Sequence, residues 1–267
     1  MEMHSSGTPQ VVAHRGSSQL NAEHTLGAYI AALDEGADAL ECDVRLTADG
    51  HLVLVHDRRI DRTANGRGLV STMELAQLDE LDFASWKNPW ADLDDEAPDV
   101  DIERRKVLTL RRLVEAVADY DRRVELAIET KHPTRYGGLV ERKLVEVLGS
   151  FGWTGVDAPA RVMSFSHVAL NRVKKLAPQL DVVQLVDKIY TWQLTKNLLE
   201  DDWIAGPGIE LLRENPKFRR RLARSGRRIH VWTVNDEADL DLCVGMGVEA
   251  VITDTPGKAL AHLRSMK

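Results

Sequence analysis

Glu41 and Asp43 stand two residues apart in a short apolar run. In a β-strand, residues i and i+2 project from one face, so both carboxylates point to one side and Cys42 to the other. Glu129 and Lys131 repeat this spacing at the end of another apolar run. Three carboxylates that converge repel one another unless a cation joins them, and oxygen-only ligands favour Mg²⁺ or Ca²⁺ over Zn²⁺. We therefore predict one divalent metal ion, Mg²⁺ or Ca²⁺, on Glu41, Asp43 and Glu129.

His14 and His56 each end a short apolar run. A single histidine at a strand end is more often structural, but two of them beside an arginine indicate a general acid and a general base acting across a phosphate. One imidazole would remove a proton from the nucleophile, and the other would protonate the leaving oxygen. Arg15 can hold phosphate oxygens with its planar guanidinium, and Lys131 can neutralise an anionic substrate beside the metal.

These residues require a scaffold that brings strand ends together. Val- and Ile-rich runs alternate with amphipathic stretches, such as the helical pattern over residues 25–35 that stops at Gly36. This alternation predicts a parallel sheet with helices outside it, and a length of 267 residues favours a (β/α)8 TIM barrel. Further helices are predicted over residues 139–148, 168–176 and 237–244. The strand candidates are residues 11–13, 39–44, 52–55, 124–128, 161–165, 182–186, 204–209, 229–234 and 250–252.

Nine strand candidates exceed the eight strands of such a barrel, so one is misassigned or lies outside it. The turn-like residues 48–50 resemble a hairpin, which would make the flanking strands antiparallel. We favour an extended crossover there instead, because the chemistry requires both strand ends at one rim. Residues 58–106 are expected to form a small inserted subdomain over that rim, within a single catalytic domain of residues 1–267.

The composition excludes several classes of protein. With 43% hydrophobic and 29% charged residues the chain is globular, and its net charge of −7 argues against nonspecific nucleic-acid binding. No run approaches the roughly 18–20 apolar residues of a membrane span, and residues 1–7 lack the apolar core of a signal peptide. Cys42 and Cys243 make neither a disulfide framework nor a CxxC site. We expect a cytoplasmic monomer or homodimer without stable membrane insertion.

The residues above belong to a series of short motifs in a fixed order along the chain. The motifs are His14-Arg15-Gly16, Ala22-Glu23-His24-Thr25-Leu26, Leu40-Glu41-Cys42-Asp43-Val44, Leu46-Thr47-Ala48-Asp49-Gly50, His56-Asp57, Arg62-Thr63, Glu129-Thr130-Lys131 and Val231-Trp232-Thr233-Val234-Asn235. Each motif alone is weak, whereas the ordered set is specific. Taken in this order, the chain resembles the glycerophosphodiester phosphodiesterase family over residues 11–254.

The resemblance implies a TIM barrel with a segment inserted after the second histidine, and metal-dependent hydrolysis of glycerophosphodiesters to sn-glycerol 3-phosphate and an alcohol. In the family the glycerol 2-hydroxyl attacks phosphorus first and water then opens a cyclic phosphate, which spares the entropy of fixing a separate nucleophile. The matching positions are His14 and His56 for catalysis, Glu41, Asp43 and Glu129 for the metal, Arg15 and Lys131 for the phosphate, and Trp232 on the substrate wall.

The chain departs from the family at one motif, where the common pattern is Pro-Glu-Asn-Thr. Ala22 and His24 replace the Pro and the Asn. We expect His24 to alter the hydrogen bonding of its loop more than the metal site. Two other residues give weaker signals. Asp57 could orient His56 or simply face solvent. Asn235 is expected to cap the helix that follows it.

Other interpretations stay open. Trp232 could be a core aromatic, and the basic residues between Arg213 and Arg228 indicate a solvated helix face or, alternatively, attraction to an anionic membrane or partner. The rival functions are a lysophospholipase D-type enzyme acting on lysophospholipids and an inactive barrel that binds phosphodiesters or a protein. The headgroup, the choice between Mg²⁺ and Ca²⁺, and the histidine that acts as base are also open.

Overall fold

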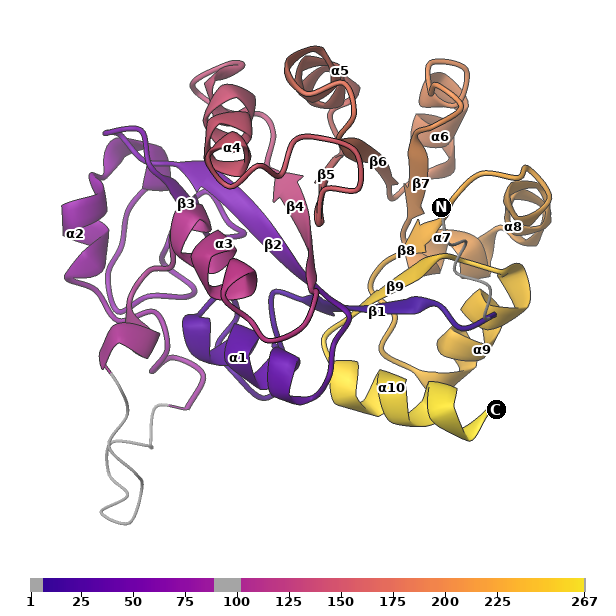
Figure 1. Cartoon of the computed structure of the whole chain (residues 1–267), viewed down its shortest axis with the longest axis horizontal. Coiled ribbons are helices and arrows are strands. Elements are labelled where there is room, and N and C mark those ends of the chain that lie inside the picture. Colours follow the sequence, from indigo (N-terminus) through magenta and orange to yellow (C-terminus); the bar gives the residue numbers. More distant parts are fainter. Residues whose placement is uncertain (1–6, 89–101, 267) are drawn as a thin grey trace.

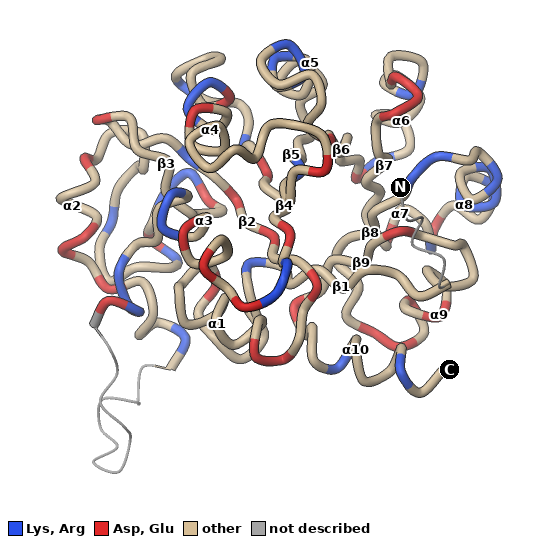
Figure 2. The backbone as a smooth tube through the Cα atoms, viewed as in Figure 1, with Lys and Arg blue, Asp and Glu red and all other residues tan. Residues whose placement is uncertain are grey.

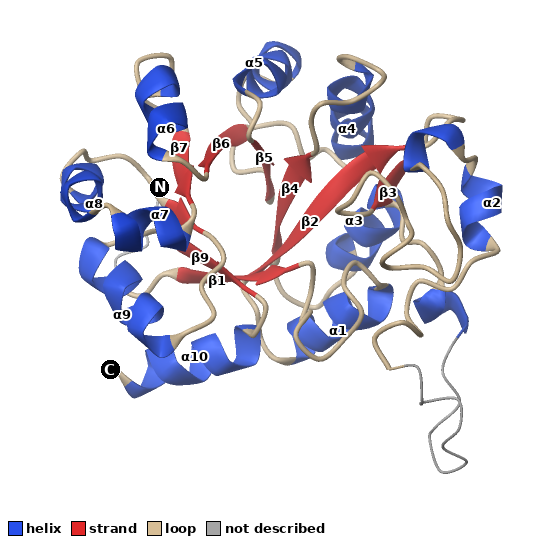
Figure 3. Ribbon diagram, turned by 180° about the vertical axis from the view of Figure 1, so that it is seen from behind, coloured by secondary structure: helices blue, strands red, loops and turns tan. Residues whose placement is uncertain are grey.

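The computed structural model describes residues 7–88 and 102–266. Eight parallel strands form the inner ring of a nearly closed barrel, and the helices lie outside it (Figures 1 and 3). Parallel bridges from Ala205 to Ile229 and from Gly208 to Trp232 bring the two ends of the sheet together. The predicted TIM barrel is confirmed. In spatial order its strands are β7 (Ile204–Pro207), β6 (Asp181–Val186), β5 (Ala160–Ser164), β4 (Glu125–Thr130), β2 (Ala39–Leu46), β1 (Gln10–His14), β9 (Ala250–Thr253) and β8 (His230–Val231).

The predicted helices are present, with bounds shifted by a few residues at most. The first begins where the Thr25 hydroxyl accepts a hydrogen bond from the amide of Ala28, and the chain leaves it through Gly36, at φ +92°. The α-helices around the barrel are α1 (Leu26–Asp34), α3 (Leu110–Ala118), α4 (Leu139–Ser150), α5 (His167–Leu176), α6 (Ile189–Thr195), α7 (Ile209–Glu214), α8 (Pro216–Ala223), α9 (Glu237–Met246) and α10 (Pro256–Ser265).

One further strand, β3 (Leu52–Leu54), lies outside the ring of eight and pairs antiparallel with β2. The prediction of an extended crossover over residues 48–50 is therefore wrong. These residues form the turn of a hairpin, the alternative that the sequence also allowed. The reason is local: Gly50 has φ +88°, and the amide of Thr47 donates to the carbonyl of His51, which closes a tight turn. β2 runs past the rim and β3 folds back, so that the amide of Val55 donates to the carbonyl of Asp43. Because β3 runs back along β2, His56 still lies at the barrel rim near Asp43, as the predicted chemistry requires.

Alternation along the strands separates two apolar layers. Val12, Ala127 and Ile252 belong to the cluster inside the barrel, whereas Ala13 and Cys42 pack outward with the helices. Since Cys42 points outward, its neighbours Glu41 and Asp43 point inward, as the spacing predicts.

Among the described residues between β3 and α3 are the short 3-10 helices Val70–Thr72 and Ile102–Arg105, and α2 (Leu75–Asp79). Val55, Ile60, Leu78 and Phe83 form part of a separate buried cluster there. That residues 58–106 constitute an inserted subdomain stays a prediction, and residues 89–101 of this range lie outside the described residues.

The basic stretch does not form a single unit. Arg213 pairs with Asp239 and Arg228 pairs with Glu249, whereas Arg220 and Arg221 of α8 are exposed and Phe218 of the same helix is buried. Figure 2 shows the basic residues of α8 in blue. Within the described residues, none of the helices has the length and apolar character needed to cross a membrane.

Candidate active site

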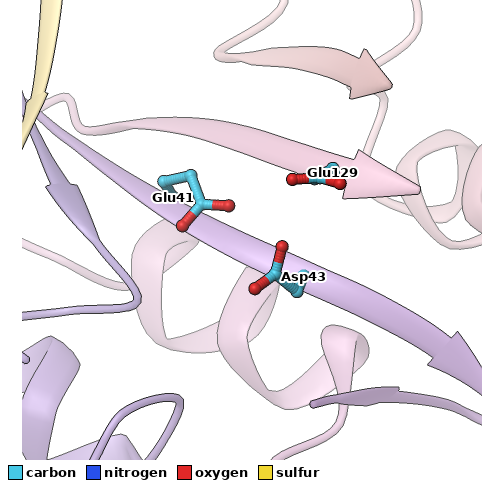
Figure 4. A group of neighbouring side chains, drawn as sticks. All are labelled: Glu41, Asp43 and Glu129. Atoms are coloured by element: carbon cyan, nitrogen blue, oxygen red, sulfur yellow. The ribbon is translucent and has the colours of Figure 1, made fainter. Parts of the chain in front are cut away.

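Three carboxylates meet inside the barrel, two from the middle of β2 and one from the carboxyl end of β4 (Figure 4). The parallel register places Asp43 directly beside Glu129, and Glu41 lies one step earlier on the same face of β2. One oxygen from each of these side chains lies within 4.8 Å of the others, and all three residues are buried. The donor set consists of oxygen atoms alone, so it fits a hard divalent cation.

The electrostatics of this trio also fit a cation. Burial and repulsion by Asp43 raise the pKa of Glu41 well above its ordinary range, and the same two causes raise the pKa of Glu129 to about 7. At Asp43 burial opposes ionisation, yet Lys131 and His24 hold its pKa well below the ordinary range. Glu41 and Glu129 therefore resist ionisation beside the charged Asp43, and a further cation between them would favour their ionised forms.

Lys131 lies against the trio. Its Nζ atom is 2.9 Å from Oδ1 of Asp43 and 2.7 Å from Oε1 of Glu129. Burial disfavours its charge, but the two carboxylates outweigh burial and raise the pKa of Lys131. The side chain is therefore a fixed, charged ammonium beside the carboxylates.

Arg15 contacts the trio through both its backbone and its side chain. Its amide donates to Oε2 of Glu41 at 3.0 Å, and its guanidinium pairs with Glu23 and Asp43. The loop can turn sharply here because Gly16 follows at φ +86°, where a Cβ atom would lie 2.6 Å from the backbone of Ala28. Only glycine fits this approach.

His14 is held by an aspartate that the sequence analysis missed. Nδ1 of His14 lies 2.7 Å from Oδ1 of Asp254, and Nε2 lies 4.0 Å from Oε2 of Glu41. Asp254 directly follows β9, and this position after a predicted strand is the signal that could have revealed it. Burial opposes its ionisation, but His14 and Asn235 lower the pKa of Asp254 to about 2.

The expectation for Asn235 is corrected. Asp236, not Asn235, is the N-terminal cap residue of α9. The side-chain amide of Asn235 donates to Oδ2 of Asp254, and its carbonyl accepts from the Asp254 amide and the Thr253 hydroxyl. Asn235 therefore positions the aspartate that holds His14.

His56 has an equivalent partner in the adjacent residue. Its Nδ1 lies 2.8 Å from Oδ1 of Asp57, so the orienting interaction that the sequence allowed is present. Arg62 donates to the other oxygen of Asp57 and also pairs with both oxygens of Glu23. Burial lowers the pKa of His56 in spite of the nearby Asp43.

The expectation for His24 is also corrected, because its ring contacts the carboxylate trio directly. Nε2 of His24 lies 2.9 Å from Oδ2 of Asp43, and Nδ1 lies 2.9 Å from the hydroxyl of Tyr29. That hydroxyl donates in turn to the carbonyl of Glu41. The departure from the family pattern thus sits at the candidate metal site and not in the loop alone.

Trp232 is half-buried: it lines the cavity and also packs against the apolar cluster inside the barrel. Its indole N–H donates to the carbonyl of Gly206, and its ring meets Phe165 edge-on with centroids 5.4 Å apart. Phe165, which follows β5, is a second aromatic in this wall that the sequence analysis did not single out. The cavity has a volume of about 150 Å³ and is lined by His14, Arg15, Glu41, His56, Glu129, Lys131, Met163, Phe165, Leu185, Trp232, Thr233 and Ile252.

Comparison with known proteins identifies the family. Residues 14–258 match the model of the glycerophosphoryl diester phosphodiesterase family. The chain belongs to this family. A Mycobacterium tuberculosis protein named "Probable glycerophosphodiester phosphodiesterase 1" is 45% identical over 96% of this chain and 93% of its own. A glycerophosphodiester phosphodiesterase of Bacillus subtilis is 34% identical over 92% of this chain and 83% of its own.

A solved structure of the family agrees with this assignment. The Oleispira antarctica phosphodiesterase, solved in complex with the product sn-glycerol-3-phosphate, is 27% identical and superposes with a TM-score of 0.79 over 96% of this chain and 97% of its own. The chain is thus an enzyme of the phosphodiesterase class, and its buried carboxylate trio could hold a metal ion.

Proposed function

We propose that this enzyme hydrolyses glycerophosphodiesters to sn-glycerol 3-phosphate and an alcohol, with a divalent metal ion and two histidines. The observation that carries the proposal is the cavity of about 150 Å³, in which Glu41 and Glu129 of the carboxylate trio meet both histidines, Arg15 and Lys131. The product bound to the Oleispira antarctica phosphodiesterase supports glycerol phosphate as one half of the substrate.

The trio formed by Glu41, Asp43 and Glu129 would hold the ion, which we take to be Mg²⁺ or Ca²⁺ because every donor is a carboxylate oxygen. A divalent ion of this kind supplies Lewis-acid polarisation of a phosphoryl oxygen. The high pKa of Glu129, about 7, supports the assignment, since a carboxylate that is hard to ionise alone ionises readily beside a cation.

Arg15 and Lys131 bind the phosphate group. Both side chains line the cavity and both are held in place by carboxylates, Glu23 for Arg15 and Glu129 for Lys131. Cations fixed in this way need no reorganisation as negative charge grows on the phosphoryl oxygens. Trp232 lines the same cavity and packs against the glycerol half.

His14 and His56 move the protons. Each ring binds an aspartate through Nδ1, Asp254 for His14 and Asp57 for His56, which leaves Nε2 for the reaction. One Nε2 takes the proton of the attacking glycerol 2-hydroxyl, and the other gives a proton to the leaving alcohol oxygen. Water then opens the cyclic phosphate, with the two proton-transfer roles exchanged.

Two further parts of the proposal concern the cell. We place the enzyme in the cytoplasm, in the breakdown of lipid-derived diesters, and two buried unpaired cysteines, Cys42 and Cys243, support a reducing compartment. It acts there as a monomer or homodimer on a small diffusible substrate.

Release of glycerol 3-phosphate from glycerophosphocholine, glycerophosphoethanolamine and glycerophosphoglycerol tests the proposal, with Mg²⁺, with Ca²⁺ and with chelator. We expect turnover that chelator abolishes and that His14→Ala and Glu41→Ala each reduce by at least roughly 100-fold. Wild-type turnover in both variants would refute the site. Cleavage of lysophosphatidylcholine but of no water-soluble diester would favour the lysophospholipase D-type alternative.

A further inference from the structure

A second cavity, of about 350 Å³, lies beside the active site and is lined by cationic side chains. Arg45, Arg58, Lys131 and Arg135 face it, and among the described residues no carboxylate lines it. The rest of its wall consists of Leu46, Leu69, Val70, Ser71, Pro133, Thr134 and Val140. Lys131 is paired with Asp43 and Glu129, so the positive charge that would attract an anionic group is mainly that of the three arginines.

Three of these cations have no acidic partner of their own. Within residues 7–88 and 102–266, no carboxylate lies within ion-pair distance of Arg45, Arg58 or Arg135. Other arginines nearby differ in this respect, because Arg59 pairs with Asp61 and Arg62 pairs with Glu23 and Asp57. In the described part of the chain, Arg45, Arg58 and Arg135 thus bring three unpaired positive charges together at the second cavity.

Arg45 is fixed in position like a binding residue. Its Nε and Nη2 atoms both donate to the carbonyl of His56, at 2.9 and 2.6 Å, and its side chain is half-buried. Arg58 donates to the carbonyl of Pro133 at 3.3 Å. A guanidinium held by carbonyl groups keeps its full charge and its remaining N–H donors for a ligand.

The chain places each of these arginines just beyond an active-site residue. Arg45 follows Asp43 by two positions on the same face of β2, Arg58 follows His56 by two, and Arg135 follows Lys131 by four. A cavity of about 630 Å³ joins the two regions: it shares His56, Glu129, Lys131 and Phe165 with the active-site cavity, and Arg45, Arg58 and Lys131 with the cationic one.

We propose that the cationic cavity binds a second anionic group, a phosphate or a carboxylate, carried by the alcohol half of the diester. This inference rests on the proposed function, because it assigns a substrate class to the same site. The active-site cavity is small enough that the glycerol and the scissile phosphate fill it. The alcohol then extends past Lys131 into the larger cavity, where Arg45, Arg58 and Arg135 meet its anionic group.

Two matched substrate pairs test the inference by kcat/KM. Glycerophosphoserine differs from glycerophosphoethanolamine by one carboxylate, and glycerophosphoinositol 4-phosphate differs from glycerophosphoinositol by one phosphate. We expect kcat/KM to be about 10-fold or more higher for the more anionic member of each pair, mainly through a lower KM. The reason is that this member gains a charge-assisted hydrogen bond to the arginines. Arg58→Gln with Arg135→Gln should bring the ratio within about twofold of one. Both residues are exposed, so the fold should survive their exchange.

Arg67→Gln is the matched control, because Arg67 is exposed and lines none of these three cavities. It should keep the wild-type preference. A wild-type ratio of one in both pairs, with glycerophosphoethanolamine hydrolysed, overturns the inference and leaves the proposed function standing. A preference that the double variant retains overturns the assignment to these arginines. Absence of turnover on every diester, with folded protein, counts against the proposed function itself.

Discussion

The Nδ1 atom of His14 lies 2.7 Å from Oδ1 of Asp254, although the two residues are 240 positions apart in the chain. β1 and β9 are parallel neighbours in the barrel, so their carboxyl ends and the residues that follow meet at one rim. The contact fixes the imidazole and directs its other nitrogen toward the carboxylate trio.

Asp254→Asn should lower kcat roughly 10- to 100-fold, because an amide cannot orient and stabilise the protonated imidazole as a carboxylate does. The free energy of unfolding of this variant should stay close to that of wild type. Steady-state kinetics and urea denaturation measure the two quantities. Asp241→Asn is the matched control, since Asp241 makes a similar 2.8 Å contact with His262 outside the active site. Equal kcat values for wild type and Asp254→Asn would contradict this role.

Metal binding should be visible in stability as well as in activity. Mg²⁺ or Ca²⁺ at 100 times its Kd stabilises the fold by about 2.7 kcal/mol, which raises the Tm by roughly 5–10 °C for a chain of this size. Glu41→Gln should abolish this shift. In chelator its Tm should equal or exceed that of wild type, because a carboxyl group that resists ionisation has been replaced by a neutral amide.

Glu146→Gln serves as the control for the metal experiment, since Glu146 is an exposed carboxylate on α4 that pairs only with Lys143 among the described residues. It should retain the full shift in Tm. The assignment of the trio would be wrong if Glu41→Gln responded to metal as wild type does.

His24 should contribute through its contact with Asp43. His24→Leu leaves the buried Oδ2 of Asp43 and the hydroxyl of Tyr29 without this partner, which costs about 1–3 kcal/mol of stability and reduces kcat. His24→Gln keeps a donor that can reach Asp43, so it should retain more of both. Urea denaturation and kcat/KM for glycerophosphocholine compare the two variants, and equal losses in both would show that the hydrogen bond to Asp43 is not what matters.

His230 should make stability fall in mild acid. Burial and the charge of Arg161 lower the pKa of His230 from 6.5 to about 4. Below pH 6.5 this histidine is protonated in the unfolded chain but stays neutral in the folded protein until about pH 4. The free energy of unfolding that depends on His230 is therefore fully present above pH 6.5 and is lost progressively down to about pH 4. The full loss is about 3 kcal/mol.

The matched variant for this pH effect is His230→Gln, which removes the titrating group. Its free energy of unfolding should fall less steeply than that of wild type between pH 6.5 and 4.5 in urea denaturation. The comparison of slopes is informative even if the variant is less stable at neutral pH. Identical slopes would show that His230 does not titrate on unfolding.

The sequence by itself determined the parts of this protein that depend on near neighbours in the chain. Strand and helix periodicity fixed the alternation of elements, and the i, i+2 spacing fixed that Glu41 and Asp43 share a face opposite Cys42. These features follow from backbone geometry within a few residues. By the same i, i+2 spacing, Arg45 lies on the face of β2 that carries Glu41 and Asp43. This position was a sign of the proposed second anion site that the sequence analysis did not use.

Only the tertiary structure decided which distant residues meet. The direction of β3 depended on a tight turn at Gly50 and on pairing with β2, and the function-based preference for a crossover was wrong there. The partners of His14 and His24, and the role of Asn235, depended on how the loops at the rim pack once the ring of strands is in place. Side-chain contacts of this kind follow from the placement of whole elements, and no local periodicity carries that information.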